Sequence, residues 1–481
     1  MLSSPGLAKA APASDLRLRP TVHTGTERWS LGERMAHYGV PGVAMAVMRA
    51  GKVAAMHGVG TRIAGRAAPV TADTLFSVGS VSKLASAALC LKLVAQGVLD
   101  LDRDVNHWLR RWRVPAGPQG DAGAVTLRML LSHTGGINIH GFADYLPGAP
   151  LPDILQTLNG EGPAKNPSIA RIDRAGSRSR YSGGGYMIVQ AVIEDASGEY
   201  FDAVARRLLF DPLGMTRSRF AASPAEDSAD IAHAHDDRGR PVALPRGWQS
   251  FPELAPSGLW TTMRDLSRLI LALGDSYRRP GGFLPQELAT EMMTVVAPGF
   301  NGLGVRLAGE GAARIFHHAG ANDSYKAYVE GNLATGDGLV VLTNGARGDV
   351  LGDEIRNAVS DACRWPGDWS VALPAIPAAA MRDGYAGTYR RREGQDPFVT
   401  GFLDTGFSAD TLELLRTGEG FSVRSKGRTR KLAAVSTSSF VMPDGYVPAA
   451  TLILKVARVG DGTAGHLLAI AGDDVLIFDR V

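Results

Sequence analysis

A serine and a lysine three positions apart form the most reactive pattern in the sequence. Among nine lysines, only Lys83 follows a serine at this spacing, in Ser80-Val81-Ser82-Lys83. An amphipathic run comes directly after it, so we expect Ser80 at a helix N-terminus and Lys83 one turn later on the same face. Burial and the helix dipole favour the neutral amine, which could then take the serine proton. Serine is inert as a nucleophile without such a base, so the pattern predicts covalent catalysis on Ser80.

Two further motifs lie downstream of this pair. The first is Tyr181-Ser-Gly-Gly-Gly-Tyr186, and alone it is typical of a glycine-rich turn before a helix over residues 187–196. The second is Phe316-His-His-Ala-Gly-Ala-Asn322, and alone it is typical of a buried strand with a core histidine. Neither motif indicates chemistry by itself.

Together and in this order, the three motifs resemble those of the serine β-lactamase and penicillin-binding-protein-like hydrolases. The family pattern is S-x-x-K, then Y-x-N, then K-T-G or its H-x-G variant. Pro41-Gly-Val-Ala, Leu130-Leu-Ser-His-Thr-Gly-Gly and Ser257-Gly-Leu-Trp-Thr-Thr-Met-Arg-Asp also match. The resemblance covers roughly Val22 to Ala362 and is closest to the class C-like branch, with its esterases and D-aminopeptidases.

The resemblance implies a role for each motif residue. Ser80 would be the acylated nucleophile, Lys83 its base partner and Tyr181 the relay of a proton to the leaving group. The backbone N–H groups of Ser80 and Ala321 would form the oxyanion hole, and His318 would complete the catalytic set. The resemblance implies no metal or cofactor.

The substrate-binding positions implied by the resemblance are Gly183, Gly320 and Asn322, and two motif positions depart from the family. Gly183 stands where the family usually has Asn, so the amide that grips a substrate acylamide carbonyl is missing. His318 replaces the lysine of K-T-G and weakens a fixed cationic site for a substrate carboxylate, since His is only partly charged near pH 7. His133 is expected to be a structural turn residue.

These departures count against an efficient β-lactamase or a D-Ala-D-Ala carboxypeptidase. The H-x-G variant resembles D-aminopeptidase-like members, so we expect a serine hydrolase that cleaves amide or peptide bonds. A carboxylesterase of the same fold is the first alternative. A catalytically silent penicillin-binding-like sensor is the alternative from another class.

The expected fold is α/β (α+β), an antiparallel sheet flanked by helices with a helical subdomain. Periodicity predicts a hairpin over Val40–Val59, a helix over Leu84–Ala95 ending near Gly97, mostly helical structure over Asp100–Pro245, a helix over Leu259–Leu273, strands over Tyr325–Val329 and Gly338–Thr343, and a helix over Val350–Ala362. We expect a flexible tail over residues 1–20, the catalytic domain over 21–364 and a linker over 365–380.

Short alternating runs predict an all-β domain over residues 381–481. These runs are Thr411–Leu415, Phe421–Arg424, Thr451–Val456 and Val475–Phe478. The segment resembles the lipocalin-like barrel appended to some of these hydrolases, with Tyr385–Tyr389 as its opening strand.

The composition and net charge limit the classes of partner that we expect this protein to bind. The 481 residues carry 51 basic and 48 acidic side chains, a net charge of +3 that does not suggest a nucleic-acid binder. We expect a small-molecule or peptide substrate, no nucleic acid and no membrane span, with the oligomeric state left open. As given, the sequence favours the cytoplasm, or the periplasm or secretion if an export signal has been trimmed.

Two smaller patterns have residue types that can form a disulfide or bind a metal. Cys90 and Cys363 exclude a disulfide scaffold and a cysteine zinc site, and their pairing is left open. His233-Ala-His235-Asp236 has no second ligand cluster, so we expect a surface hairpin there.

Overall fold

The computed structural model describes most of the chain in two compact units. The described residues are 13–23, 25–120, 123–224, 230–244, 246–366, 370–372, 374, 376, 380, 383–395, 410–418, 420–425, 427–442, 453–458, 464–471 and 474–481. The first unit comprises residues 1–16, 31–352 and 362–367, and the second comprises 17–30, 353–361 and 368–481. The predicted tail up to residue 12, and much of the predicted linker over 365–380, lie outside the described residues, so those boundaries stay predictions.

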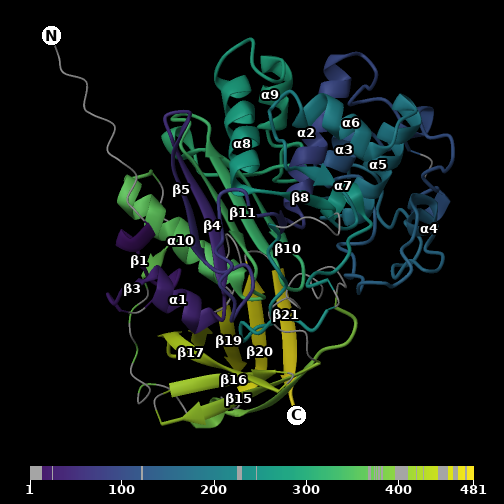
Figure 1. Cartoon of the computed structure of the whole chain (residues 1–481). Coiled ribbons are helices and arrows are strands. Elements are labelled where there is room, and N and C mark those ends of the chain that lie inside the picture. The colour runs from purple at the N-terminus through teal and green to yellow at the C-terminus, as the bar shows by residue number, and fades with distance from the viewer. Residues whose placement is uncertain are drawn as a thin grey trace. The chain divides into compact units, whose positions relative to one another are not determined.

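The first unit is built on an antiparallel sheet in the order β5-β4-β12-β11-β10-β9 (Figure 1). Its strands are β4 (Gly42–Arg49), β5 (Lys52–Gly60), β9 (Arg306–Ala308), β10 (Ile315–Ala321), β11 (Lys326–Asn332) and β12 (Gly338–Thr343). The predicted hairpin is confirmed, because β4 pairs with β5 around a tight turn at Ala50-Gly51, where φ is 49° and 76°. Glycine and few other residues accept such dihedrals without strain.

The helices of the first unit pack on this sheet and form a separate helical lobe (Figure 1). They are α1 (Leu31–Tyr38), α2 (Val81–Ala95), α3 (Leu127–Leu131), α4 (Ile154–Asn159), α5 (Gly183–Ser197), α6 (Phe201–Ala205), α7 (Leu254–Ser257), α8 (Met263–Arg278) and α9 (Gln286–Met292). The last helix, α10 (Gly348–Cys363), is divided between the two units. The amphipathic α8 packs its buried Leu266, Leu269, Ile270 and Leu273 toward the sheet and contacts β4, β5, β11 and β12. An apolar stripe at this spacing is the usual sign of a helix that covers a sheet.

Three of the predicted elements need correction. The helix expected from Leu259 begins only at Met263, because residues Leu259–Thr261 form strand β8. The glycines of the second motif are the first turn of α5 and not a turn before it. The region 100–245 is mostly loop, with one long helix, α5 of 15 residues, and several short helices between its Gly and Pro residues.

A small sheet in the order β6-β8-β7 carries the chain into α2. Its strands are β6 (Phe76–Ser77), β7 (Arg219–Phe220) and β8 (Leu259–Thr261). Helix α2 follows β6 after a short turn, and its residues from Val81 to Leu91 are buried on every side. A helix that is apolar all round belongs in the core, so its N-terminus is held in place from all directions.

The second unit contains a closed antiparallel barrel, and this part of the predicted fold is confirmed. Its described strands are β14 (Gly387–Arg391), β15 (Thr411–Thr417), β16 (Gly420–Ser425), β17 (Arg428–Ser436), β18 (Ser439–Val441), β19 (Ile453–Arg458), β20 (Ala464–Ala471) and β21 (Asp474–Arg480). Pairing of β14 with β21, with Tyr389 opposite Arg480, closes it. Alternate residues such as Leu412 and Leu414 point into an apolar core, as the period-two pattern predicts. Outside the barrel, β1 (Arg17–Leu18) pairs with β3 (Trp29–Ser30), and β2 (Val22–His23) pairs with β13 (Val371–Ala372).

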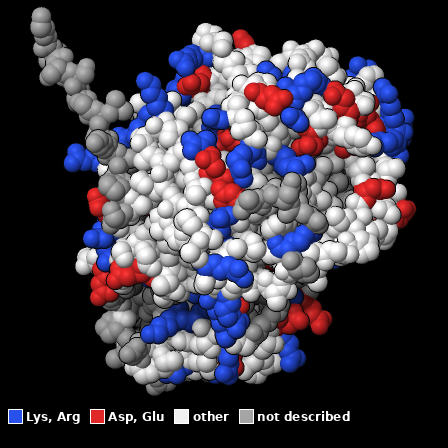
Figure 2. All heavy atoms as spheres, viewed as in Figure 1, with Lys and Arg blue, Asp and Glu red and all other residues white. Residues whose placement is uncertain are grey.

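The charges on the surface are mixed, as the similar numbers of basic and acidic residues predict. On the face shown in Figure 2, basic and acidic side chains are interspersed and do not form a single-sign field. No helix among the described residues is long and apolar enough to cross a bilayer. Cys90 and Cys363 are both buried and free.

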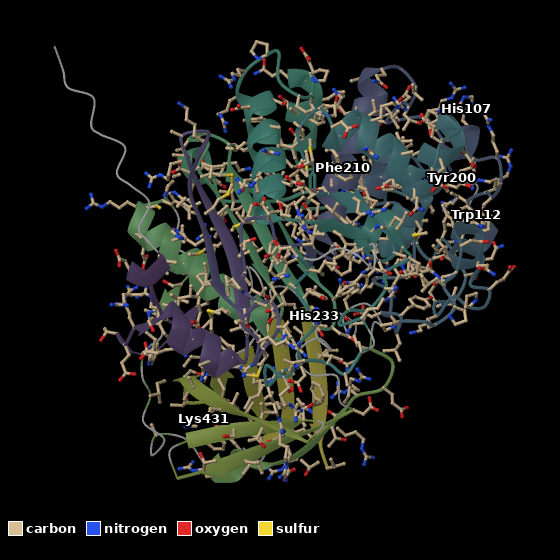
Figure 3. All side chains as sticks on the ribbon, in the orientation of Figure 1. His107, Trp112, Tyr200, Phe210, His233 and Lys431 are labelled. Atoms are coloured by element: carbon tan, nitrogen blue, oxygen red, sulfur yellow. The ribbon has the colours of Figure 1, made fainter. Side chains whose placement is uncertain are left out.

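The pair His233 and His235 has a structural role. His235 is fully buried, where Nε2 accepts from the N–H of Ala64 at 3.0 Å and Nδ1 donates to the carbonyl of Asn344 at 2.9 Å. His233, labelled in Figure 3, lies edge-on to Trp248. The expected hairpin is present, because His235 pairs antiparallel with Pro241 across a turn at Asp236, but the His235 side chain lies in the core and not on the surface. Across the described residues, no group of three His, Cys, Asp or Glu is placed to hold a metal ion.

Candidate active site

The candidate nucleophile Ser80 directly precedes helix α2, at the N-terminal end of that helix. It occupies the N-cap position with helical dihedrals, and its side chain makes no cap hydrogen bond. The backbone of the preceding Val78 donates to the carbonyl of Leu259 at 3.2 Å, and Ser82 Oγ accepts from the Leu259 N–H at 3.0 Å. Strand β8 therefore fixes the turn on both sides of Ser80 while leaving its hydroxyl available.

A backbone-to-backbone contact joins this turn to the end of β10. A Cβ on Gly320 would lie 1.9 Å from the carbonyl oxygen of Val78 and 3.0 Å from the Ser80 nitrogen. Gly79 has φ +48°, and a Cβ there would lie 2.8 Å from the nitrogen of Ala321. Only glycine permits such an approach. The two glycines thereby bring the backbones of Ser80 and Ala321, the two predicted oxyanion-hole donors, to the same place.

The side chain of Lys83 is buried and contacts the Ser80 hydroxyl. Its Nζ is 3.0 Å from Ser80 Oγ and donates to the carbonyl of Pro256 at 3.0 Å. Burial lowers the pKa of Lys83, interaction with the Tyr181 hydroxyl raises it, and the nearby Arg306 cation lowers it further. The balance is a lowered pKa, which favours the neutral amine that general-base chemistry requires.

Tyr181 lies beside this lysine, and His133 holds it there. The Lys83 Nζ is 4.9 Å from the centre of the Tyr181 ring, and the His133 ring centre is 4.3 Å from it. His133 has φ +64°, its carbonyl accepts from the N–H of Arg180 at 2.7 Å, and its Nδ1 accepts from the N–H of Ser182 at 3.1 Å. His133 thus fastens the residues on either side of Tyr181, a positioning role beyond that of a simple turn residue.

His318 is buried on β10 with its ring centre 6.5 Å from that of Tyr181. Burial is the first cause that holds the pKa of His318 well below its usual value, followed by the Arg306 cation and by Lys83 in its charged form. The imidazole is therefore neutral at pH 7, where the sequence suggested partial charge. Its Nδ1 lies 2.6 Å from the carbonyl oxygen of Ala319, which can only accept. Nδ1 must carry the proton, and Nε2 keeps a free lone pair.

The three predicted substrate-binding positions have distinct surroundings. Gly320 packs against the nucleophile turn, as described above. Asn322 donates from Nδ2 to Ser77 Oγ at 2.5 Å, which ties the end of β10 to β6. A Cβ on Gly183 would lie 3.0 Å from the ring of Phe142 and 3.2 Å from the carbonyl oxygen of His140. The Phe142 ring and the His140 backbone therefore fill the space that the usual Asn side chain would enter.

Arg306 is one residue of this site that the sequence motifs missed. It begins β9, pairs in register with His317, and places its Cζ 5.7 Å from the centre of the Tyr181 ring. It is half-buried, and no ion pair joins it to a carboxylate in the described part of the chain. A guanidinium without a carboxylate partner is thus present among Lys83, Tyr181 and His318, where the K-T-G lysine is missing.

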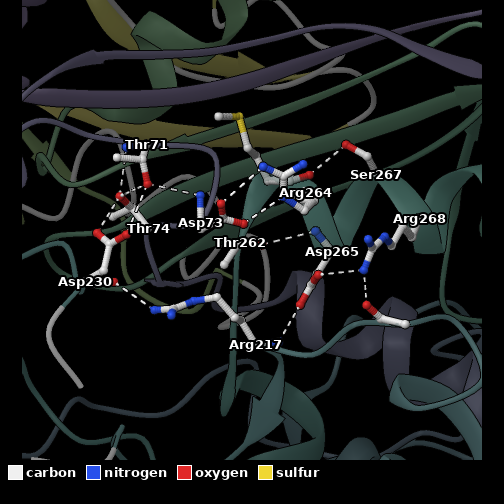
Figure 4. A network of polar contacts seen from close by, with 12 residues as sticks. Thr71, Asp73, Thr74, Arg217, Asp230, Thr262, Arg264, Asp265, Ser267 and Arg268 are labelled. Carbon is white, nitrogen blue, oxygen red and sulfur yellow. Dashed lines mark hydrogen bonds and ion pairs between the residues drawn. The ribbon is translucent and has the colours of Figure 1, made fainter. Parts of the chain in front are cut away.

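A polar network next to β6 and β8 supports the nucleophile turn (Figure 4). Arg264 at the start of α8 holds Asp73 through two bonds of 2.7 and 3.1 Å. The buried Asp265 accepts from the Arg217 N–H and from Ser218 Oγ, both at 2.9 Å. The network ties the segment leading into β6 to the helix that follows β8, so both strands beside Ser80 are anchored.

Comparison with known proteins agrees with this architecture. The family description Beta-lactamase matches residues 30–363. Esterase EstB of Burkholderia gladioli is 29% identical over 262 residues, which cover 48% of this chain and 64% of that protein. Penicillin-binding protein 4 of Amycolatopsis lactamdurans is 28% identical over 389 residues, covering 75% of this chain and 96% of that protein. An octameric penicillin-binding protein homologue from Pyrococcus abyssi superposes with a TM-score of 0.60 at 21% identity, covering 93% of this chain and 98% of that one.

The fold and the matched family place the chain in the family of β-lactamase-type serine hydrolases. The chain belongs to the β-lactamase family, whose members include esterases, amidases, β-lactamases and penicillin-binding proteins. The chain spans just under two thirds of the length of the esterase EstB, so that protein's activity does not transfer to this one as a fact. The resemblance expected from the motifs is confirmed at the level of family and fold.

Proposed function

We propose that this protein hydrolyses amide or peptide bonds through an acyl-enzyme on Ser80. The observation that carries the proposal is the 3.0 Å contact between Lys83 Nζ and Ser80 Oγ in a buried position that disfavours the ammonium. In the first step the Ser80 proton passes to neutral Lys83 as Oγ attacks the carbonyl carbon. The negative charge that develops on the carbonyl oxygen is stabilised by the N–H groups of Ser80 and Ala321.

The leaving nitrogen then has to gain a proton as its bond to carbon breaks. Tyr181 is next to Lys83, so the proton taken from Ser80 can return through the tyrosine hydroxyl to the amine. Neutral His318, with a free Nε2 lone pair, adds an acceptor near Tyr181, since the two ring centres are 6.5 Å apart. Water then attacks the acyl-enzyme and regenerates Ser80 with the same groups acting in reverse.

The position of Arg306 favours a substrate that carries a carboxylate near the scissile bond. His318 is uncharged, so it cannot replace the fixed cation of K-T-G, whereas Arg306 places a permanent charge 5.7 Å from the Tyr181 ring. Guanidinium groups bind carboxylates in a bidentate way. The cation thus lies beside the proposed proton relay, where the leaving group would be.

A carboxylesterase is the second candidate, favoured by two observations. One relative is an esterase. In addition, the space beside Gly183 leaves no room for an Asn side chain, whose amide binds the acylamide carbonyl of the substrate in other family members. Esters also need less help from a proton donor, because an alkoxide leaves more readily than an amine.

A substrate panel separates the candidates. We expect wild-type enzyme to cleave p-nitrophenyl esters rapidly, D- or L-amino-acid p-nitroanilides measurably and nitrocefin poorly, and we expect Ser80→Ala to lose all turnover. Turnover of esters alone would favour the carboxylesterase. No turnover of any compound would favour the silent sensor and contradict the proposal.

A further inference from the structure

A pair of carboxyl groups, Asp144 and Glu253, lies outside the catalytic set and has no cation bound to it. Glu253 is 2% exposed, and its Oε1 has no hydrogen-bond partner among the residues that the structure describes. Asp144 is half-buried, and its Oδ2 accepts only a backbone N–H, that of Asp323, at 3.1 Å. Neither side chain takes part in an ion pair within the described ranges. A buried carboxyl oxygen without a donor is costly, which indicates a missing partner.

Three backbone segments hold the pair together. Tyr145, next to Asp144, exchanges backbone hydrogen bonds with Ser250 at 3.0 and 2.8 Å, which brings Asp144 to the segment that leads to Glu253. The two carboxyls are close enough for Asp144 to raise the pKa of Glu253, although burial is the larger cause of its value of about 8. Burial, followed by the charge of Asp323, raises the pKa of Asp144 to about 7.

The same segments reach the candidate catalytic groups. Glu253 begins α7, where the carbonyl of Pro256 accepts from Lys83 Nζ at 3.0 Å. Asp323, which binds the Asp144 carboxylate, comes two residues after Ala321 on the β10 side of the oxyanion hole. The pair is therefore connected to both sides of the place where the substrate carbonyl would be.

The two lysines nearest to the pair are engaged elsewhere. Lys165 donates from Nζ to the backbone carbonyl of Asp144 at 2.6 Å and lies 4.4 Å from the centre of the Tyr145 ring. Lys326 donates to the backbone carbonyls of Asn322 and Asp323. Both ammonium groups thus bind carbonyl oxygens. Their charges act to lower the pKa of Asp144, and that of Lys165 acts to lower the pKa of Glu253, but neither forms an ion pair with these carboxyls within the described ranges.

We propose that Asp144 and Glu253 bind a protonated amino group on the acyl part of the substrate, which makes free amines, and not N-acylated compounds, the preferred substrates. An ammonium group has three donors and no acceptor, which suits two carboxyl groups better than any neutral group. A metal ion fits less well, since the described residues offer no third ligand here. The proposal rests on the proposed function, because the amino group is recognised only in a compound whose carbonyl reaches Ser80.

Competitive inhibition tests this without requiring that amides be turned over. At pH 7.5 the Asp144 carboxyl, with a pKa of about 7, is mostly ionised, and an α-amino group of pKa about 7.7 to 8 is still mostly protonated. The probes are D- and L-alaninamide and their N-acetyl forms. They compete with hydrolysis of p-nitrophenyl acetate. We expect one free-amine enantiomer to inhibit at about tenfold lower concentration than its N-acetyl form, in line with a charged hydrogen bond.

The variants Asp144→Asn and Glu253→Gln should reduce this preference to about twofold or less while keeping p-nitrophenyl acetate turnover. The exposed Glu161→Gln is the matched control and should keep the full preference. Equal inhibition by amine and N-acetyl forms in wild type, or an unchanged preference in Asp144→Asn, would overturn the proposal. Because Asp144 is half-buried, that variant decides the matter even if Glu253→Gln fails to fold. If the wild-type enzyme does not hydrolyse p-nitrophenyl acetate at all, this result would instead contradict the proposed function.

Discussion

Replacing Arg306 by Gln should move the acid limb of the pH–rate profile to higher pH. Lys83 acts as a base only when neutral, and the Arg306 cation is one of the causes that lower the pKa of Lys83. Removing the cation therefore raises that pKa, and less neutral amine remains at any pH below it. His318 also loses this repulsion, but burial is the first cause of its low pKa, so it stays uncharged.

The magnitude follows from the distances to a shared ring. Lys83 Nζ and Arg306 Cζ are 4.9 and 5.7 Å from the Tyr181 centroid, so the two cations are within about 11 Å of each other. With an effective dielectric constant of about 20 to 40, their repulsion is roughly 0.8 to 1.6 kcal/mol. The neutral fraction of Lys83, and with it the rate on the acid limb, should fall by about 4- to 15-fold.

The assay is kcat/KM for the uncharged p-nitrophenyl acetate between pH 5 and 9, so that loss of a carboxylate-binding cation does not affect the result. Arg110→Gln, at an exposed position, is the control for a general change in charge and should leave the limb in place. An Arg306→Gln limb that stays in place or moves to lower pH would refute the reasoning.

Three further predictions follow from the site and its supports. Tyr181→Phe should reduce amide hydrolysis by about 10²- to 10⁴-fold and activated-ester hydrolysis much less; equal loss in both assays would remove tyrosine from proton transfer. Gly183→Asn should lower kcat/KM by displacing the Phe142 ring, which a Cβ meets at 3.0 Å, and a crystal structure with that ring unmoved would contradict this. In thermal unfolding, Asp265→Ala should lower Tm several times more than Asp73→Ala, because Asp265 is 2% exposed with two donors whereas the Asp73 pair is half-exposed; equal losses would contradict this.

Local patterns sufficed for the core of the candidate site. A serine and lysine three apart at a helix start are close in space because helix geometry places them so, whatever surrounds them. The hairpin around Ala50-Gly51 and the alternating strands of the barrel were predictable for the same reason. The three motifs follow one another along the chain in the order found in the β-lactamase family, and the resemblance then implied a role for each.

What was missed depends on contacts between distant segments. Arg306 reaches Tyr181 only because β9 pairs with β10, and the sole signal in the sequence is a lone arginine on a short strand before the third motif. The glycines of the second motif read as a turn because glycine is a poor helix former. They form a helical turn since Ser182 caps it, accepting from the Gly185 N–H at 2.9 Å, and since Phe142 leaves no room for larger residues.

Covalent labelling of Ser80 tests the central claim most directly. Wild-type protein treated with a fluorophosphonate and measured by intact mass should gain one adduct, and peptide mapping should locate it on Ser80. Ser82→Ala, whose hydroxyl only accepts from a backbone N–H, should still be labelled, whereas Ser80→Ala should remain unmodified. A folded Ser80→Ala protein that is labelled as fully as wild type would contradict the account.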